Sequence, residues 1–132
     1  MRVLLVEDSE LLAKHLLEQL SAVPIVETVG VARTERQAIE QITEHSPDFV
    51  ILDLHLKHGT GFGVLESLPS MGKRPVVAVL TNHNLPQYRE RAMALGARYY
   101  LDKSSEFDRL PRIIDELTVA SGAQVAAPSG RA

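Results

Sequence analysis

The chain has 132 residues, and its 14 Lys and Arg against 17 Asp and Glu give a formal net charge of −3 with the five histidines neutral. Residues are 45% hydrophobic and 23% charged, which is enough apolar material for one packed core and excludes disorder throughout. The longest apolar run, Val76 to Leu80, covers five residues, whereas a membrane span needs about twenty. We therefore expect no membrane span. We also expect no secretory signal, because Glu7 and Asp8 interrupt the first apolar run.

The composition also limits the chemistry and the partners. The chain has no cysteine, which excludes disulfides, thiolate nucleophiles and Cys-ligated metals and suits a cytoplasmic protein. Its acidic balance argues against direct binding of nucleic acid. Any chemistry must use carboxylates, hydroxyls, histidines and lysines.

Short apolar runs alternate along the chain with segments of helical periodicity. The predicted strands, in chain order, are Val3–Val6, Ile25–Val31, Phe49–Leu52, Val76–Leu80 and Tyr99–Leu101. The segments that follow each strand carry apolar residues three or four apart, as in Leu12 and Leu16, which predicts helices. Strands that alternate with helices specify a parallel sheet with right-handed crossovers and helices on both faces.

Local signals place three helix ends. Thr34 with Gln37 is typical of a capping box, and Gly96 is typical of the residue just past a helix. Pro111 is tolerated only in a first turn, so we expect the last helix to begin near Asp108.

The fold class that follows is α/β, a three-layer doubly wound (βα)5 sandwich with a parallel five-stranded sheet. The second strand leads into its helix without polar residues comparable to those after the other strands, which suits an edge position and the order 2-1-3-4-5. We expect one domain over residues 1–119. Residues 120–132, rich in Ala, Gly, Ser and Pro, predict a flexible C-terminal tail.

Polar side chains follow four of the predicted strands, at the sheet edge where open α/β folds bind ligands. They are Glu7 and Asp8, Asp53, Thr81 and Asn82, and Asp102 and Lys103. Carboxylates packed together need a cation, and oxygen ligands suit a hard divalent ion such as Mg²⁺. Lys103 and Thr81 would complete a clamp for a phosphoryl group, with Asp53 as the nucleophile. The alternative is that Glu7 and Asp8 simply cap a helix.

At these positions the chain closely resembles the receiver domains of two-component response regulators. The resemblance is carried by VLLVEDSE at the start, DFVILDLHLKHGTGFGVL around Asp53, VVAVLTNH, and ALGARYYLDKS. It implies a flavodoxin-like fold and a phosphoacceptor at Asp53. It also implies Mg²⁺ held by Asp8, Asp53 and the backbone carbonyl of His55, with Glu7 acting through water.

The same resemblance implies the partners and the switch. Lys103 would pair with the phosphoryl group, and Thr81 and Tyr100 would move together to switch the surface of the fourth helix, fifth strand and fifth helix. The donor would be a sensor histidine kinase or a histidine phosphotransfer protein, and a downstream protein effector would read the switched surface. The chain would act as a stand-alone receiver and would catalyse only its own phosphorylation and dephosphorylation. Whether phosphorylation causes the chain to dimerise is left open by the sequence.

Three residues depart from the family pattern. Lys57 and Ser104 stand where the family commonly has proline, which predicts a less constrained loop after Asp53 and an unfamiliar turn after Lys103. Asn82 stands where Ala or Gly is usual, which enlarges the group at the phosphoryl entrance.

Two histidines, His55 and His83, each follow a site residue by two positions. One hypothesis is that they tune autodephosphorylation together with Asn82. The alternatives are solvated loop histidines, or a zinc site completed by His58.

Three other functions compete with the receiver. An aspartyl-nucleophile phosphohydrolase would need a second acid where this chain has His55. A nucleotide-dependent oxidoreductase would need glycines where this chain has Glu7-Asp8-Ser9. A constitutive interaction module would have no use for the intact set of acids.

Overall fold

The computed structural model describes residues 1–83 and 85–126, apart from the side chains of Phe107 and of residues 120–126. Five strands alternate with five α-helices along this part of the chain. The strands are β1 Arg2–Val6, β2 Glu27–Ala32, β3 Phe49–Leu52, β4 Val76–Thr81 and β5 Tyr99–Asp102. The helices are α1 Glu10–Ser21, α2 Glu35–His45, α3 Gly61–Met71, α4 Pro86–Ala94 and α5 Leu110–Ala126.

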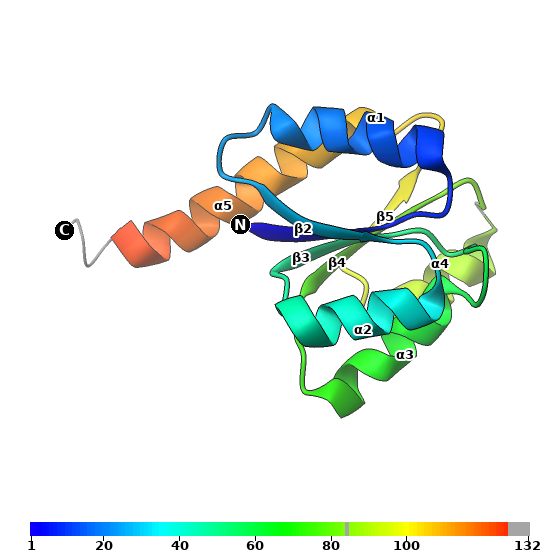
Figure 1. The fold of residues 1–132 in the computed structure, drawn as a ribbon. Helices are drawn as coiled ribbons and strands as arrows, with labels where there is room; N and C mark the ends of the chain where they lie inside the picture. The colour runs from blue at the N-terminus through cyan, green and yellow to red at the C-terminus, as the bar shows by residue number, and fades with distance from the viewer. Residues whose placement is uncertain (84, 127–132) are drawn as a thin grey trace.

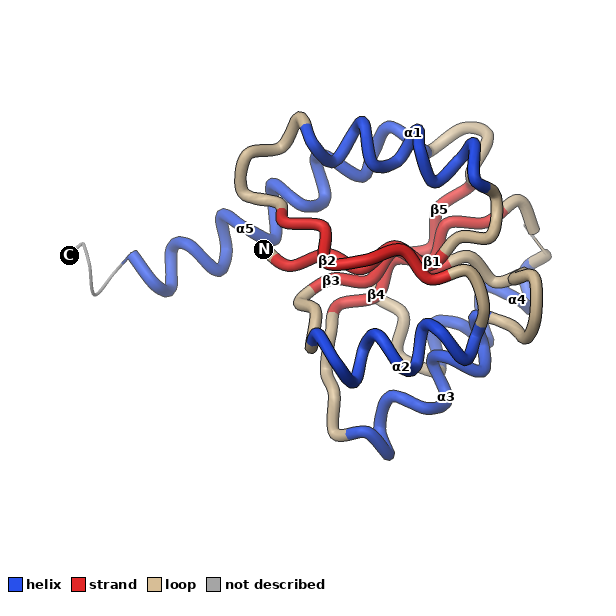
Figure 2. Tube along the Cα trace, in the orientation of Figure 1, coloured by secondary structure: helices blue, strands red, loops and turns tan. Residues whose placement is uncertain are grey.

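The strands form one parallel sheet in the order β2-β1-β3-β4-β5, which confirms the predicted fold class and topology. Figures 1 and 2 show the three layers, with α1 and α5 on one face of the sheet and α2, α3 and α4 on the other. The carboxyl ends of all the strands therefore lie at the same edge, where the loops into the helices begin.

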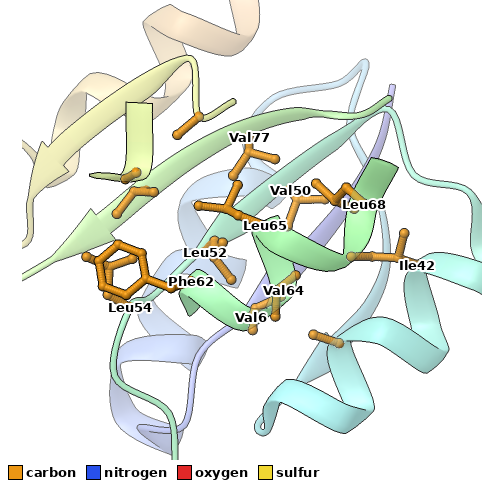
Figure 3. Close-up of a cluster of buried hydrophobic side chains, with 14 of the residues drawn as sticks. Val6, Ile42, Val50, Leu52, Leu54, Phe62, Val64, Leu65, Leu68 and Val77 are labelled. Atoms are coloured by element: carbon orange, nitrogen blue, oxygen red, sulfur yellow. The ribbon is translucent and has the colours of Figure 1, made fainter. Parts of the chain in front are cut away.

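The central strands are apolar on both faces because helices cover both. On β1, Leu4 and Val6 pack toward α2, α3 and α4, whereas Val3 and Leu5 pack toward α1 and α5. Figure 3 shows the first of these two clusters, in which Val6, Val50 and Leu52 meet Val64 and Leu65 of α3. Neighbouring strand residues point to opposite faces, so a continuous apolar run is the pattern that this burial requires.

Most of the predicted helix ends are confirmed. The Thr34 hydroxyl accepts a hydrogen bond from the Gln37 amide at 3.1 Å and caps α2, and Gly96 has a φ of +110° just after α4. The start predicted near Asp108 is wrong, because a 3₁₀ turn over Phe107–Arg109 comes first and α5 begins at Leu110. Pro111 lies in the first turn of α5, as its missing amide hydrogen requires.

The predicted tail boundary needs correction. Helix α5 continues to Ala126, so the chain is helical well past residue 119 and runs beyond the sheet in Figure 1. The physical reason is that no proline occurs between residues 112 and 126, and alanine, frequent there, has the highest helix propensity. The rest of the predicted tail, residues 127–132, lies outside the described residues.

None of the helices in the described part of the chain is both long enough and apolar enough to cross a membrane.

Candidate functional site

The ends of β1, β3 and β5 bring together two carboxylates and one ammonium group. Lys103 Nζ lies 2.9 Å from Glu7 Oε1 and 2.9 Å from Asp53 Oδ2. The side chains of Glu7 and Asp53 are only 2% and 5% exposed, and that of Lys103 is 12% exposed. Because β1 and β3 are neighbours, their ends place the two acids side by side, while Lys103 reaches them across the end of β4.

The pKa values of Glu7 and Lys103 are both raised. Burial raises the pKa of Glu7, and hydrogen bonds from the Ser9 amide and from Lys103 only partly offset this. Burial by itself would lower the pKa of Lys103, but its bonds to Asp53 and Glu7 outweigh burial, so the pKa of Lys103 is raised. Lys103 is therefore firmly protonated at neutral pH.

The site also offers a set of oxygen ligands for a metal ion. One carboxylate oxygen from each of Glu7, Asp8 and Asp53 lies within 4.8 Å of the other two. The three acids and Lys103 carry a net charge of −2 when all are ionised, which one divalent cation neutralises. Carboxylate oxygens without nitrogen or sulfur ligands suit Mg²⁺, so the donor set fits the expected metal.

The loop after β1 holds its acids in place through local hydrogen bonds. Ser9 is the N-cap of α1, and its hydroxyl accepts from the Leu12 amide at 3.3 Å. The Ser9 amide in turn donates to Glu7 Oε2 at 3.0 Å. The interpretation of Glu7 and Asp8 as helix caps is therefore wrong, since Ser9 is the residue that caps α1.

The end of β2 also contributes to this edge, contrary to our expectation. Arg33 donates to the backbone carbonyl of Asp8 at 3.1 Å and pairs with Glu10 at 3.0 Å. The Arg33 guanidinium thus contacts the loop that carries Glu7 and Asp8. A cation directly after a strand is the signal that could have identified it.

Thr81 ends β4 and is fully buried. Its hydroxyl accepts a hydrogen bond from the His83 amide at 3.2 Å, and its carbonyl accepts from the Lys103 amide at 3.0 Å. Asn82, next along the loop, is exposed.

Two histidines join the loops that follow β3 and β4. The rings of His55 and His83 stack with their centroids 3.6 Å apart and their planes at 26°. The His55 amide donates to Asp53 Oδ1 at 3.3 Å, which ties this pair to the buried carboxylate. The three-histidine zinc site is wrong, because within the described residues the only cluster of metal-binding side chains is the acidic one.

Tyr100 connects β5 to the same β4–α4 loop. Its hydroxyl donates to the His83 carbonyl at 2.5 Å. Tyr100 is 7% exposed, and the Arg89 guanidinium lies 5.7 Å from its ring centroid. Burial raises the pKa of the Tyr100 hydroxyl, so it remains a donor at neutral pH.

The turn after Lys103 has its own constraint in place of proline. Asp102 Oδ1 accepts from the Ser104 amide at 2.7 Å and from the Ser104 hydroxyl at 2.5 Å. The carboxylate of Asp102 is thus engaged in this turn, whereas Glu7, Asp8 and Asp53 face the candidate metal position.

Comparisons with known proteins agree on one family. The sequence profile of the response regulator receiver domain matches residues 3–115. The sensory transduction protein LytT of Enterococcus faecalis is 30% identical over 95% of this chain, and a protein-glutamate methylesterase/protein-glutamine glutaminase of Symbiobacterium thermophilum is 35% identical over 79%. The chain spans only 51% and 29% of the lengths of these two relatives.

Solved structures show the same fold. The receiver domain of the putative response regulator NarL from Mycobacterium tuberculosis has a TM-score of 0.81 at 26% identity, covering 88% of this chain and 94% of its own. The response regulator domain of CheB from Thermotoga maritima has a TM-score of 0.77 at 22% identity, covering 88% and 91%.

Proposed function

Because the chain belongs to the response regulator receiver domain family, the phosphoacceptors of two-component signalling, we propose that Asp53 is the residue that accepts the phosphoryl group. The donor is a phosphohistidine on a sensor histidine kinase or a histidine phosphotransfer protein. The observation that carries the proposal is the buried Asp53 carboxylate, bonded to Lys103 and lying within 4.8 Å of two further acids.

The transfer step follows from this geometry. An oxygen of Asp53 attacks phosphorus, the bond from phosphorus to the donor imidazole breaks, and its electron pair leaves with the imidazole nitrogen. Lys103 then stabilises the negative charge of the transferred group, since its ammonium already contacts Asp53 at 2.9 Å. Thr81 donates its hydroxyl hydrogen to a phosphoryl oxygen.

Asp8, Asp53 and the backbone carbonyl of His55 would hold the metal directly, and Glu7 through water. When bound, Mg²⁺ neutralises the clustered carboxylates and orients the phosphoryl oxygens. In the absence of metal, Lys103 bridges Glu7 and Asp53, with its ammonium 2.9 Å from an oxygen of each carboxylate.

The switch uses the backbone of His83 as its link. The Thr81 hydroxyl accepts from the His83 amide, and the His83 carbonyl accepts from Tyr100. A Thr81 hydroxyl drawn toward a phosphoryl group moves the loop to which Tyr100 is bonded. This shifts the population of the α4–β5–α5 surface, which a protein effector then binds.

On this proposal the chain works in the cytoplasm and recognises proteins rather than nucleic acid or membrane. It catalyses only its own phosphorylation and dephosphorylation. Beryllofluoride, which mimics a phosphoryl group, would bind at the same site.

The test is phosphorylation by acetyl phosphate with Mg²⁺, measured by intact mass. We expect one phosphoryl adduct on the wild type, none on Asp53→Asn, and one on the control Asp115→Asn, whose carboxylate is exposed on α5. No adduct on the wild type, with no response to beryllofluoride, would favour a constitutive interaction module. Rapid multiple turnover of a phosphate ester would favour a phosphohydrolase.

A further inference from the structure

Residues 55–60, the last part of the loop between β3 and α3, are bonded to Glu35, the first residue of α2. The Thr60 amide donates to Glu35 Oε1 at 2.9 Å, and the Glu35 amide donates to the His58 carbonyl at 3.0 Å. Two loop residues are therefore bonded to a single residue of a neighbouring helix. This contact constrains the loop in which Lys57 replaces the usual proline.

The loop and α3 are shaped to admit this side chain. Gly59 has a φ of +85°, and a Cβ added there would lie 2.4 Å from the Cβ of Glu35. A Cβ added at Gly63 would lie 2.3 Å from the Glu35 carboxylate carbon. Both distances are below any normal contact between carbon atoms, so the two glycines leave the space that Glu35 fills.

The charge of Glu35 suits its position. Helix α3 has no acidic residue in its first turn, and its N-cap is Thr60, whose amide bonds to the Glu35 carboxylate. A negative charge at a helix N-terminus is stabilising because unpaired amides leave partial positive charge there. Glu35 supplies from α2 the charge that α3 lacks in its own first turn.

This contact is connected directly to the candidate metal site. Thr60 forms an antiparallel bridge with His55, and the Gly61 amide donates to the Leu54 carbonyl at 2.9 Å. His55 is thus fixed on one side by Asp53, through its amide, and on the other by Thr60. Thr60 is therefore paired across the loop with the residue whose carbonyl is assigned to the metal.

We propose that Glu35 is a positioning residue that holds the 55–60 loop so that the His55 carbonyl is set for metal binding. The inference rests on the proposed function, because it assigns the His55 carbonyl to Mg²⁺. Glu35 itself does not contact the metal or the phosphoryl group.

The test measures the loop and the metal separately by nuclear magnetic resonance. Hydrogen exchange of the Thr60 amide is recorded without metal, and Mg²⁺ affinity is taken from the amide shifts during a titration. In Glu35→Ala we expect Thr60 exchange to rise by roughly tenfold or more, because a hydrogen bond to a charged group is lost. We expect Mg²⁺ affinity to fall about threefold or more, with Glu35→Gln intermediate because its amide oxygen still accepts a hydrogen bond.

The control is Glu40→Ala, which removes an exposed carboxylate paired with Arg36 on the same helix. Equal Thr60 exchange and equal Mg²⁺ affinity in the Glu35 and Glu40 variants would overturn the proposal. Exchange that rises evenly across the sheet in both Glu35→Ala and Glu35→Gln would also overturn it, since Glu35 would then act on global stability. An absence of any Mg²⁺ response in the wild type would instead overturn the metal step of the proposed function, and with it the role of Glu35 toward the metal.

Discussion

Replacing Lys103 by methionine tests how the charges at the site are balanced. The substitution removes the only ammonium within 2.9 Å of Glu7 and Asp53 among the described side chains, while the chain length and most of the apolar volume are kept. Two nearly buried carboxylates are then left without their partner. Phosphoryl transfer is also expected to fail, because no ammonium group remains to stabilise the negative charge of the transferred phosphoryl group.

The expected cost follows from burial. Removing one partner of a buried ion pair costs about 3 to 5 kcal/mol, because an uncompensated charge stays buried. Lys103 is 12% exposed and the neighbouring Asp8 is half-buried, so water reaches part of the cluster. We therefore expect the free energy of unfolding to fall by about 3 kcal/mol without metal. Saturating Mg²⁺ should recover part of this loss, since the ion replaces the missing positive charge.

The assay is urea unfolding followed by circular dichroism, since the chain has no tryptophan, with EDTA and then with Mg²⁺. Lys57→Met, which changes an exposed lysine on a neighbouring loop, is the matched control. Equal unfolding midpoints for the two variants in EDTA would refute the reasoning.

The pH dependence gives a second check on the same variant. Glu7 has a raised pKa in the folded protein, so the folded state binds this proton more tightly than the unfolded state. Its contribution to stability therefore falls as the pH rises through that pKa. Without Lys103, which lowers the pKa of Glu7, the total fall should be larger and should extend to higher pH. The difference in the free energy of unfolding between the wild type and the Lys103 variant should become smaller as the pH is lowered from neutral and Glu7 becomes protonated. Lys103 in the wild type has a raised pKa, so its contribution is complete below about pH 10.5 and is lost above it.

Two further predictions concern the loops around the site. In His55→Ala and His83→Ala we expect the phosphoaspartate to decay about threefold faster or more, because the stacked pair that joins the two loops no longer limits the access of water; unchanged decay rates in both variants would reject this role. In Tyr100→Phe we expect a loss of about 1 kcal/mol in the free energy of unfolding, from the bond to the His83 carbonyl, with phosphorylation of Asp53 retained. For Tyr100→Phe, urea unfolding measures the stability and the acetyl phosphate adduct measures phosphorylation. Loss of the adduct in this variant would show that Tyr100 serves the chemistry itself.

Much of the site could be predicted from the order of residues along the chain. Glu7 and Asp53 directly follow an apolar run, and Asp8 and Lys103 come one residue later. A parallel sheet brings the ends of such runs to one edge. The prediction needed only the alternation of strands and helices. For the same reason it could say nothing of residues that reach the site from the starts of helices.

Arg33 and Glu35 are the clearest cases. Arg33 contacts Asp8 across 25 positions of sequence, and Glu35 contacts Thr60 across 25 positions. Arg33 is marked in the sequence only by its place directly after a strand, and no local pattern marks Glu35. The partner of each residue depends on how closely two elements approach in space. The same holds for the stacked His55 and His83, which the sequence marks only by their offset from Asp53 and Thr81.

The sequence by itself determined the layers, the strand order and the edge of the sheet at which the acids gather, because hydrophobic periodicity is local and a parallel topology follows from it. Only the tertiary structure decided that α5 begins after a 3₁₀ turn and continues to Ala126, that Ser9 caps α1, and which cation meets which carboxylate. Those outcomes depend on side-chain distances of about 3 Å. Such distances are set by the packing of whole elements against one another.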